Sequence, residues 1–177
     1  FVLIDATVNS HVEHADTSRS GLYIQKSGNT VDDDLLLYRG LVEAGKSCGA
    51  LPHRKWRLEF RSGLFPNYEE LISHATLPLE NSYQTTDLFT LPGTSEQAVL
   101  MAVPLIGGDG TVYGLCGFEI SQRYFKSMHG QPTNLPHMVC LLTSGENGIL
   151  DAENGLSCGV SNGYYFAPKG TLVKKDL

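Results

Sequence analysis

The stretch from residue 98 to residue 121 constrains the fold of this chain more than any other part. Two apolar runs, AVLMAVPLI and TVYGLCGFEIS, are joined by the glycine-rich segment GGDG. Both alternating faces of the first run are apolar, which is typical of a strand covered on both sides. In the second run Val112, Gly114, Cys116, Phe118 and Ile120 share one face by the two-residue period of a strand. The stretch therefore predicts an antiparallel hairpin at the centre of a sheet.

Composition and charge narrow the class of protein. The chain has 177 residues, 41% of them hydrophobic, with 13 basic and 19 acidic side chains and a net charge of −6. These values are typical of a globular protein with a sizeable core. An acidic balance argues against a nucleic-acid-binding surface, which needs clustered Lys and Arg. No run approaches the ~18 apolar residues of a membrane span.

Periodicity predicts the elements before the hairpin. They are a strand or a helix end at 1–4, a strand at 21–26, a helix at 32–45, a strand at 56–60 and a helix from 67. Asp32–Asp34 places negative charge where a helix N-terminus favours it, and Gly45 is a plausible end for that helix. The second helix is predicted to start at Asn67 with Glu70 completing a capping box, and to bury the face that includes Tyr68.

A composition shift follows the hairpin. The expected order is a short helix at 122–129, a turn-rich linker at 130–136, a strand at 137–143 and two further short strands near 148–150 and 163–167. We therefore expect two units, residues 1–129 and a smaller or incomplete unit at 130–177.

The segments Tyr83–Asp87, Val99–Leu105 and Asp109–Ser121 carry a resemblance to a known family. The last of them, DGTVYGLCGFEIS, is similar to the family ending "dG-x-v-x-G-v-x-g-x-D-I-S", with Glu119 in place of the family's aspartate. The chain resembles a Cache domain, the PAS-like extracytoplasmic sensor module of bacterial receptors. The resemblance implies an α+β fold in which helices flank an antiparallel PAS-like sheet, followed by a second, membrane-proximal unit.

The resemblance also implies a pocket. Pro66-Asn67-Tyr68 stands where the amino-acid-binding branch of the family has Pro-Trp-Tyr, with Arg61 upstream and Tyr83 at a later tyrosine. Thr85 takes the place of the family's aspartate, and Asp87 follows two residues on.

The residue types support a pocket independently of the family. Gly114 and Gly117 remove side chains above the sheet, arginines offer forked donors to a carboxylate, and tyrosines add an aromatic wall with hydroxyl groups. The alternative is that the arginines form a solvated strand face and the glycines serve packing. The candidate ligand-binding residues are Trp56, Arg57, Arg61, Tyr68, Tyr83, Asp87 and Phe118.

The predicted function is that of a non-enzymatic extracytoplasmic sensor. It would bind a small metabolite, such as an amino acid or a carboxylate, and act on a membrane-tethered output such as a two-component kinase or a transcription regulator. Flanking segments would tether it to the membrane, and a homodimer is an open alternative. No cofactor, metal or nucleic acid is expected. Two other functions stay open: a small cytoplasmic enzyme using Cys48 and His53, and a ligand-free PAS-like dimerisation scaffold.

Cysteine and histidine spacing favours neither disulfides nor a metal site. Cys48, Cys116, Cys140 and Cys158 are widely spaced, and Cys116 and Cys140 fall in apolar runs, so that buried free thiols are expected. The redox compartment stays open. The segment His11–Asp16 contains four residues of metal-ligating type, but it does not have the HExxH spacing and falls in an apparent loop, which predicts a polar surface stretch.

Overall fold

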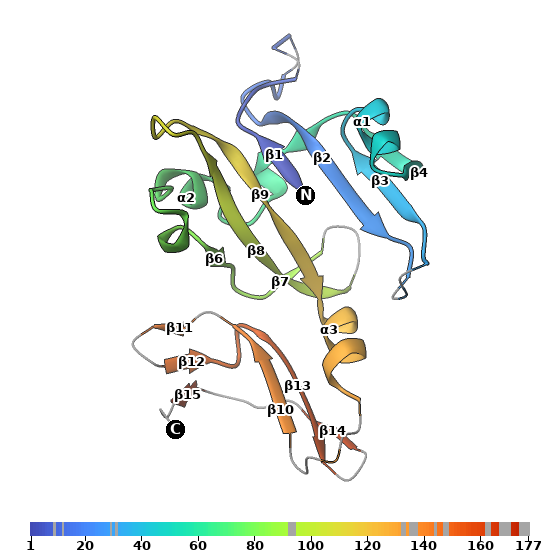
Figure 1. The fold of residues 1–177 in the computed structure, drawn as a ribbon, viewed down its shortest axis with the longest axis vertical. Coiled ribbons are helices and arrows are strands. Elements are labelled where there is room, and N and C mark those ends of the chain that lie inside the picture. Colours follow the sequence, from blue (N-terminus) through green and yellow to red (C-terminus); the bar gives the residue numbers. More distant parts are fainter. Residues whose placement is uncertain are drawn as a thin grey trace. The chain divides into compact units, whose positions relative to one another are not determined.

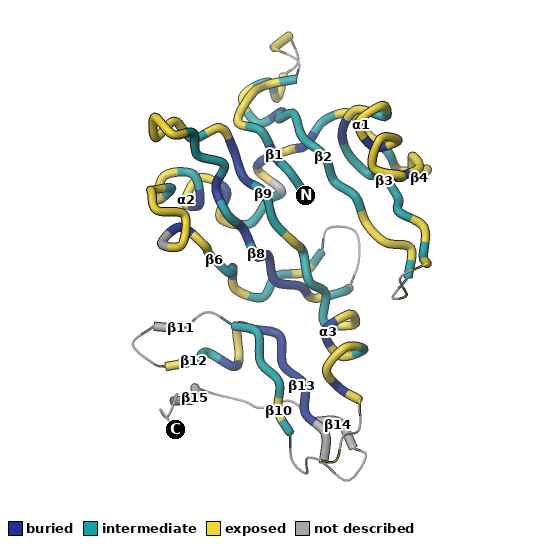
Figure 2. Tube along the Cα trace, viewed as in Figure 1, coloured by how far each residue is buried: buried dark blue, intermediate teal, exposed yellow. Residues whose placement is uncertain are grey.

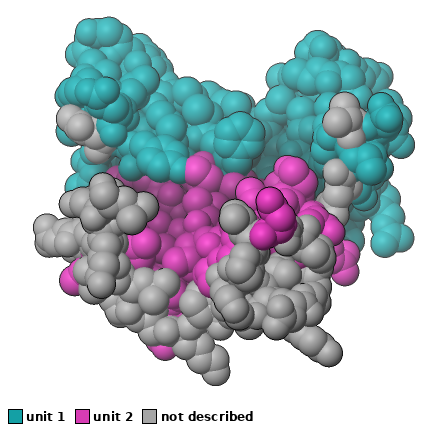
Figure 3. All heavy atoms as spheres, turned by 60° about the horizontal axis from the view of Figure 1, so that its bottom comes forward, with its two compact units in different colours: residues 1–83, 102–118 teal, residues 84–101, 119–177 magenta. Residues whose placement is uncertain are grey.

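The structure is a computed structural model of the chain. It describes residues 1–8, 10–11, 13–28, 30, 32–91, 95–131, 134, 138–143, 145–146, 149–161, 164–166 and 171–173. The fold is mixed α+β, with a large, mostly antiparallel sheet and few helices. The chain divides into two compact units (Figure 3). Unit 1 comprises residues 1–83 and 102–118, and unit 2 comprises residues 84–101 and 119–177.

The elements follow one another along the chain as shown in Figure 1. The strands up to the hairpin are β1 (Val2–Ile4), β2 (Ser18–Lys26), β3 (Leu35–Arg39), β4 (Ala50–Arg57), β5 (Phe60–Arg61), β6 (Gln84–Thr85), β7 (Phe89–Thr90), β8 (Gln97–Ile106) and β9 (Val112–Ser121). The later strands are β10 (Met138–Leu142), β11 (Gly145–Glu146), β12 (Ile149–Asp151), β13 (Leu156–Ser161), β14 (Tyr164–Phe166) and β15 (Thr171–Val173). The helices are α1 (Val42–Ser47), α2 (Tyr68–Ser73) and α3 (Gln122–His129), with short 3-10 turns η1 (Ser62–Leu64) and η2 (Leu79–Asn81).

The largest sheet of the described residues has the strand order β4-β3-β2-β1-β9-β8-β6, with β5 also paired to β2 and β7 to β8. The short strand β1 pairs antiparallel to β2 on one side and to β9 on the other. Leu3, in the middle of β1, is fully buried. The first strand of the chain thus closes onto the hairpin, which lies far away in the sequence (Figure 1).

The predicted hairpin is confirmed as β8 and β9. Consecutive residues Ala98, Val99 and Leu100 are all fully buried, as expected for a strand covered on both faces. The dark stretch along β8 in Figure 2 shows this burial. At the turn, Gly110 has a φ of 83° and its N–H donates to the Gly107 carbonyl at 2.9 Å. Glycine suits this position because other residues adopt a positive φ at a cost.

The predicted helix at 32–45 is wrong over most of its length. Residues Leu35–Arg39 form strand β3 between β2 and β4, and only Val42–Ser47 are helical. Leu37 is fully buried there. A run of three leucines satisfies a strand buried on both faces as well as it satisfies a helix, and the neighbouring strands decide between them. Asp33 caps no helix; it accepts a hydrogen bond from the Thr30 hydroxyl at 2.9 Å in the preceding turn.

Two other local predictions are corrected. The strand predicted at 56–60 is divided between β4 and β5, which pair with different partners, β3 and β2. Helix α2 does begin after Asn67, and Tyr68 and Leu71 are buried. Its predicted capping box is absent, because Asn67 has a φ of 55° and its side chain makes no capping hydrogen bond. Asparagine tolerates this left-handed conformation better than most residues.

Unit 2 has its own core. Val99, Phe125, Leu156 and Cys158 form a buried cluster that joins β8, α3 and β13. The helix predicted at 122–129 is confirmed as α3, which the Ser121 hydroxyl caps by accepting the Tyr124 N–H at 3.2 Å. Among the described residues, β10, β13 and β14 form one three-stranded sheet and β11, β12 and β15 form another.

Periodicity found three of these later strands and missed three. The strands predicted at 137–143, 148–150 and 163–167 correspond to β10, β12 and β14, although 137, 148, 163 and 167 lie outside the described residues. Strand β13 was missed although its sequence, LSCGVS, alternates apolar residues with polar or small ones. Most of the linker predicted at 130–136 also lies outside the described residues.

The compact units divide the chain at other places than residue 130. Both α3 and the first half of β8 belong with the C-terminal strands. The division into a unit at 1–129 and a unit at 130–177 therefore stays a prediction. No helix in the described part of the chain is long and apolar enough to cross a membrane.

Candidate functional site

Three side chains from three elements of unit 1 meet in one cluster. Asp5 follows β1, Arg19 lies in β2, and Tyr68 is the first residue of α2. Because Ile4 is the register partner of Ser20, the antiparallel pairing places Asp5 beside Arg19. We call Asp5, Arg19 and Tyr68 the acid–base cluster.

Direct hydrogen bonds hold the acid–base cluster together. The Tyr68 hydroxyl donates to Asp5 Oδ1 at 2.8 Å, and Arg19 Nε donates to the same oxygen at 3.0 Å. The Arg19 guanidinium also lies 5.9 Å from the centre of the Tyr68 ring, within cation–π range. Tyr68 is only 4% exposed, whereas the Asp5 side chain is 39% exposed. The cluster is therefore buried on its tyrosine side and open to solvent on its carboxylate side.

Burial and charge set the protonation states of the cluster. Burial, and secondly the hydrogen bond to Asp5, raise the pKa of Tyr68 to about 12. Burial alone would lower the pKa of Arg19, but its interactions with Tyr68 and then with Asp5 outweigh that effect and raise the pKa. At neutral pH the phenol is therefore protonated and donates, and the guanidinium is charged.

The acid–base cluster leaves one acceptor available. Both hydrogen bonds from Arg19 and Tyr68 end on Oδ1 of Asp5, and Oδ2 accepts none from the described residues. A carboxylate oxygen can accept from an N–H donor such as an ammonium group. The cluster thus offers a negative charge to a ligand's amine, beside a phenol and a guanidinium.

Replacement of Tyr68 by Phe is expected to remove a loss of folding stability that the wild-type chain shows at alkaline pH. Because the pKa of Tyr68 is raised in the folded state, the phenol stabilises the fold fully below pH ~10 and loses this contribution as the pH rises through about 12. The wild-type chain should lose about 2 kcal/mol from this group between these limits. Urea titrations at a series of pH values measure the loss, which the Tyr68→Phe chain should lack.

Tyr83 provides the matched control, because its ring is 47% exposed. A Tyr83→Phe chain should keep the wild-type alkaline loss, so that general effects of high pH cancel in the comparison. Equal losses in the wild-type and Tyr68→Phe chains would contradict the burial of a protonated Tyr68.

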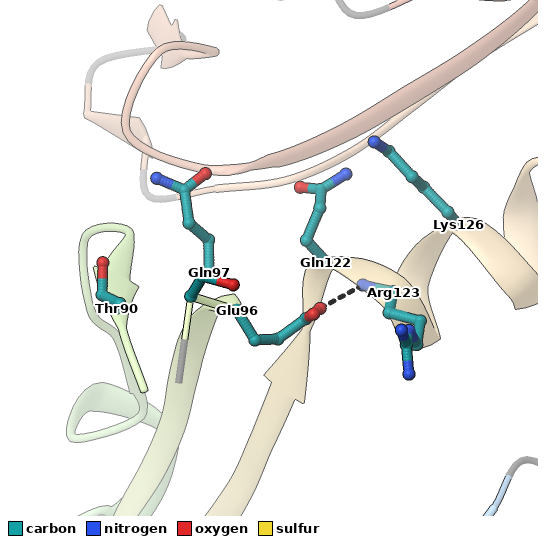
Figure 4. A pocket seen from close by; sticks show the side chains of 7 residues that line it. Thr90, Glu96, Gln97, Gln122, Arg123 and Lys126 are labelled. Carbon is teal, nitrogen blue, oxygen red and sulfur yellow. Dashed lines mark hydrogen bonds between the residues drawn. The ribbon is translucent and has the colours of Figure 1, made fainter. Parts of the chain in front are cut away.

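Unit 2 contains a second, open site, which we call the polar groove. Its volume is about 660 Å³, and Thr90, Ser95, Glu96, Gln97, Gln122, Arg123 and Lys126 line it. In Figure 4 the polar ends of Gln97, Gln122 and Lys126 point to the same side, whereas the Arg123 guanidinium points away from them. The groove combines amide groups with a single inward-facing ammonium, so it suits a polar ligand better than an apolar one.

Side chains of the polar groove already make hydrogen bonds near the N-terminus of α3. The Glu96 carboxylate accepts the Arg123 N–H at 2.7 Å (Figure 4). Gln122 Nε2 donates to the Ser157 carbonyl at 3.0 Å. An acidic side chain thus occupies the positive end of the helix, where an external anion would otherwise be favoured.

Only one of the sequence-predicted ligand residues lies in the acid–base cluster, and that residue is Tyr68. Trp56 is half-buried in β4 and its indole N–H donates to the Gly40 carbonyl at 2.9 Å. The other predicted residues are exposed: Arg57 in β4, Arg61 in β5, Tyr83 after η2, Asp87 between β6 and β7, and Phe118 in β9. The structure does not gather the predicted set around one cavity in its described part.

Arg57 lies at a basic edge of the sheet. Its register partner across β3 and β4 is Arg39, and β4 is the outermost strand. Burial, and secondly the charge of Arg57, lower the pKa of Arg39. Both guanidinium groups donate to backbone carbonyls, Arg39 to that of Tyr38 and Arg57 to that of Trp56, each at 2.7 Å. The environment of Arg57 matches the solvated strand face considered from the sequence.

The hollow predicted above Gly114 is absent. A Cβ at this position would lie 2.0 Å from the Leu3 carbonyl oxygen, because the β1 backbone passes directly against β9. A Cβ at Gly21, across from Leu3 on β2, would lie 2.3 Å from the Val2 carbonyl oxygen. These glycines admit a neighbouring strand and leave no room for a ligand.

The segments considered for metal and thiol chemistry lie on the surface. In the loop that contains His11 and His14, the His14 carbonyl accepts the Ser18 N–H at 2.8 Å. His53 stacks on Tyr38 with ring centres 4.3 Å apart, and Cys48 is exposed after α1. Within the described ranges, no group of three or more His, Cys, Asp or Glu side chains is arranged to hold a metal ion.

Asp5 and Arg19 are the members of the cluster that the sequence reasoning missed. Asp5 directly follows the apolar run at 1–4, and Arg19 lies just before the strand predicted at 21–26. A charged residue at the end of an apolar run can indicate a site, but only the pairing of β1 with β2 shows that Arg19 lies beside Asp5.

Comparison with known proteins adds no identification to this geometry. No protein-family model, curated protein or solved structure matches the chain.

Proposed function

We propose that this chain is a non-enzymatic, Cache-like sensor domain that binds a small amine-bearing metabolite, such as an amino acid, in unit 1. The observation that carries the proposal is the environment of Tyr68. This residue occupies the position that the resemblance assigns to the pocket helix, and it is buried against a carboxylate and a guanidinium. Such a set of groups complements a ligand that bears both an amine and a carboxylate.

The sheet supports the PAS-like part of the proposal. In the stretch β2-β1-β9-β8-β6, the first strand of the chain lies between the second strand and the last strand of the hairpin. Helices α1 and α2 both occur in the connection from β2 to β6, and α2 begins at the position that the resemblance assigns to the pocket helix. Strands β3 and β4 extend this arrangement at the β2 edge.

The proposed mechanism is a shift between two conformations. Asp5, Arg19 and Tyr68 connect the end of β1, the start of β2 and the start of α2. A ligand amine that bonds to Asp5 Oδ2 binds the same carboxylate that Arg19 and Tyr68 hold through Oδ1, so the three elements respond together. Such a ligand changes the output only if it binds one conformation more tightly than the other. The extracytoplasmic location and the membrane-tethered output are further parts of the proposal, and they depend on the resemblance of the hairpin.

A thermal-shift screen tests ligand binding. The panel contains amino acids, carboxylates without an amine, simple amines and nucleobases. Amine-bearing compounds are expected to raise Tm with concentration as mass action requires. The Tyr68→Phe chain, which loses the donor that orients the Asp5 carboxylate, should bind about 5–10-fold more weakly. Isothermal titration of the best compound measures that ratio.

Matched variants separate the acid–base cluster from other sites. Tyr83→Phe should leave the affinity unchanged, because Tyr83 lies outside the cluster and is exposed. A ligand whose binding is lost in Lys126→Ala but kept in Tyr68→Phe would place the site in the polar groove and contradict our assignment. A panel without any stabilising compound would contradict ligand binding and favour a ligand-free scaffold.

A further inference from the structure

Two cysteines of unit 2 lie directly opposite each other on neighbouring strands. Cys140 on β10 and Cys158 on β13 are register partners in an antiparallel pair. Such partners have Cα atoms about 4.5 or 5.5 Å apart, and both separations fall within the range of disulfide-bonded cysteines. Their side chains point to the same face of the sheet, since opposite residues of a ladder do so.

The surroundings of the two thiols agree with this placement. The neighbouring Cys140 is one of the groups that raise the pKa of Cys158. Cys158 belongs to the buried core of unit 2, and Cys140 packs against that core from a half-buried position. The Cys140 sulfur also lies 3.9 Å from the His129 carbonyl at the end of α3. One thiol is thus reachable from solvent, and the other is reached through it.

We propose that Cys140 and Cys158 are a site of oxidative modification, where a thiol–disulfide oxidant such as oxidised glutathione forms a cross-strand disulfide. The Cys140 thiolate attacks one glutathione sulfur, which forms a mixed disulfide and releases one glutathione thiolate. The Cys158 sulfur, after losing its proton to solvent, then attacks Cys140 Sγ and releases the second glutathione. Two protein thiols are oxidised, and one glutathione disulfide is reduced to two thiols. The order follows from exposure, because only Cys140 is accessible to the oxidant.

The protonation of Cys158 agrees with its role as the second thiol. Burial, and secondly the neighbouring Cys140, raise the pKa of Cys158, while the charge of Lys126 acts in the opposite direction. A thiol with a raised pKa is a poor first nucleophile at neutral pH. It attacks efficiently once the mixed disulfide is held beside it.

The experiment uses the full chain with Cys48→Ser and Cys116→Ala, so that the two remaining thiols are Cys140 and Cys158. The reduced protein is incubated with oxidised glutathione at neutral pH, and its thiols are counted after denaturation. We expect both thiols to disappear and the mass to fall by that of two hydrogen atoms. The disulfide should raise Tm by about 5–10 °C, because it closes a loop in the unfolded chain. Reduction should reverse the shift.

Two controls keep the result interpretable. Adding Cys140→Ala to the same background should leave Cys158 as a free thiol, without a change of mass. Peptide mapping of the oxidised four-cysteine chain should recover a peptide that links Cys140 to Cys158, which avoids any effect of the background substitutions. Retention of both thiols, stable glutathione adducts or disulfide-linked dimers would each overturn the proposal.

Discussion

A Gly114→Ala substitution is expected to destabilise unit 1 by about 3 kcal/mol or more. Gly114 has a φ of 150°, which side-chain-bearing residues rarely adopt, and the new methyl group would lie 2.0 Å from the Leu3 carbonyl oxygen. That oxygen is part of the central strand β1, so relief of the contact requires β1 and β9 to separate. Urea unfolding followed by the fluorescence of Trp56, the single tryptophan of the chain and a residue of β4, measures the effect.

Gly108→Ala is the matched control in the same hairpin. A Cβ at Gly108 meets no atom within 4 Å, so its substitution should change stability by less than about 0.5 kcal/mol. If both alanine variants unfold at the same urea concentration, then β1 does not pack against β9 in the way described. This comparison also tests whether Gly114 serves packing, because a glycine above a hollow would tolerate alanine.

A Phe125→Ala substitution is expected to destabilise unit 2 by about 3–4 kcal/mol. Phe125 is 6% exposed and lies in a cluster with Val99, Leu156 and Cys158. Loss of its ring removes apolar burial and leaves a cavity that the surrounding strands fill only partly. Urea unfolding followed by far-ultraviolet circular dichroism measures the loss, since unit 2 lacks a tryptophan.

The neighbouring aromatic residue of α3 provides the control for Phe125. Tyr124 is 42% exposed, so Tyr124→Ala removes a ring of similar size from the same helix with little loss of burial. Its effect should stay below about 1 kcal/mol. Similar losses for the two variants would show that burial of Phe125 in the core of unit 2 does not determine the result.

The elements best predicted from the sequence are those whose local pattern has one interpretation. The hairpin was found because its two runs are long, β-rich and separated by a glycine turn. Helix α3 was predicted at the residues that it occupies, and the Ser121 hydroxyl caps it there. In both places the local preference and the final environment agree, as is typical of sequences that fold reliably.

The errors fall where a short apolar run fits two structures. Leu35–Leu37 can be the face of a helix or a strand buried on both sides, and the residues alone do not distinguish the two. Pairing with β2 and β4 decides for the strand, because the leucines then become interior residues of a sheet. The same pairing leaves the preceding aspartates in a turn, where Asp33 bonds to Thr30.

The candidate site was only partly predictable. Tyr68 was identified as a pocket residue, and it is the member of the acid–base cluster with the strongest local signal, at the start of an amphipathic helix. Asp5 lies 63 positions before Tyr68 in the chain, and no local pattern connects them. Five of the other six predicted residues are exposed: Arg57 and Arg61 at strand ends, Tyr83 and Asp87 between elements, and Phe118 on a solvent-facing side of β9.

Local pattern alone determined the mixed composition of strands and helices, the hairpin and the position of α3, since each depends on neighbours within a few residues. The tertiary structure decided which strand lies beside β1, why Gly114 must lack a side chain, and which carboxylate Tyr68 meets. It also placed Cys140 opposite Cys158. These features depend on the register between strands that are distant in the chain, and register is set by the burial of whole faces of the sheet, which no single segment encodes.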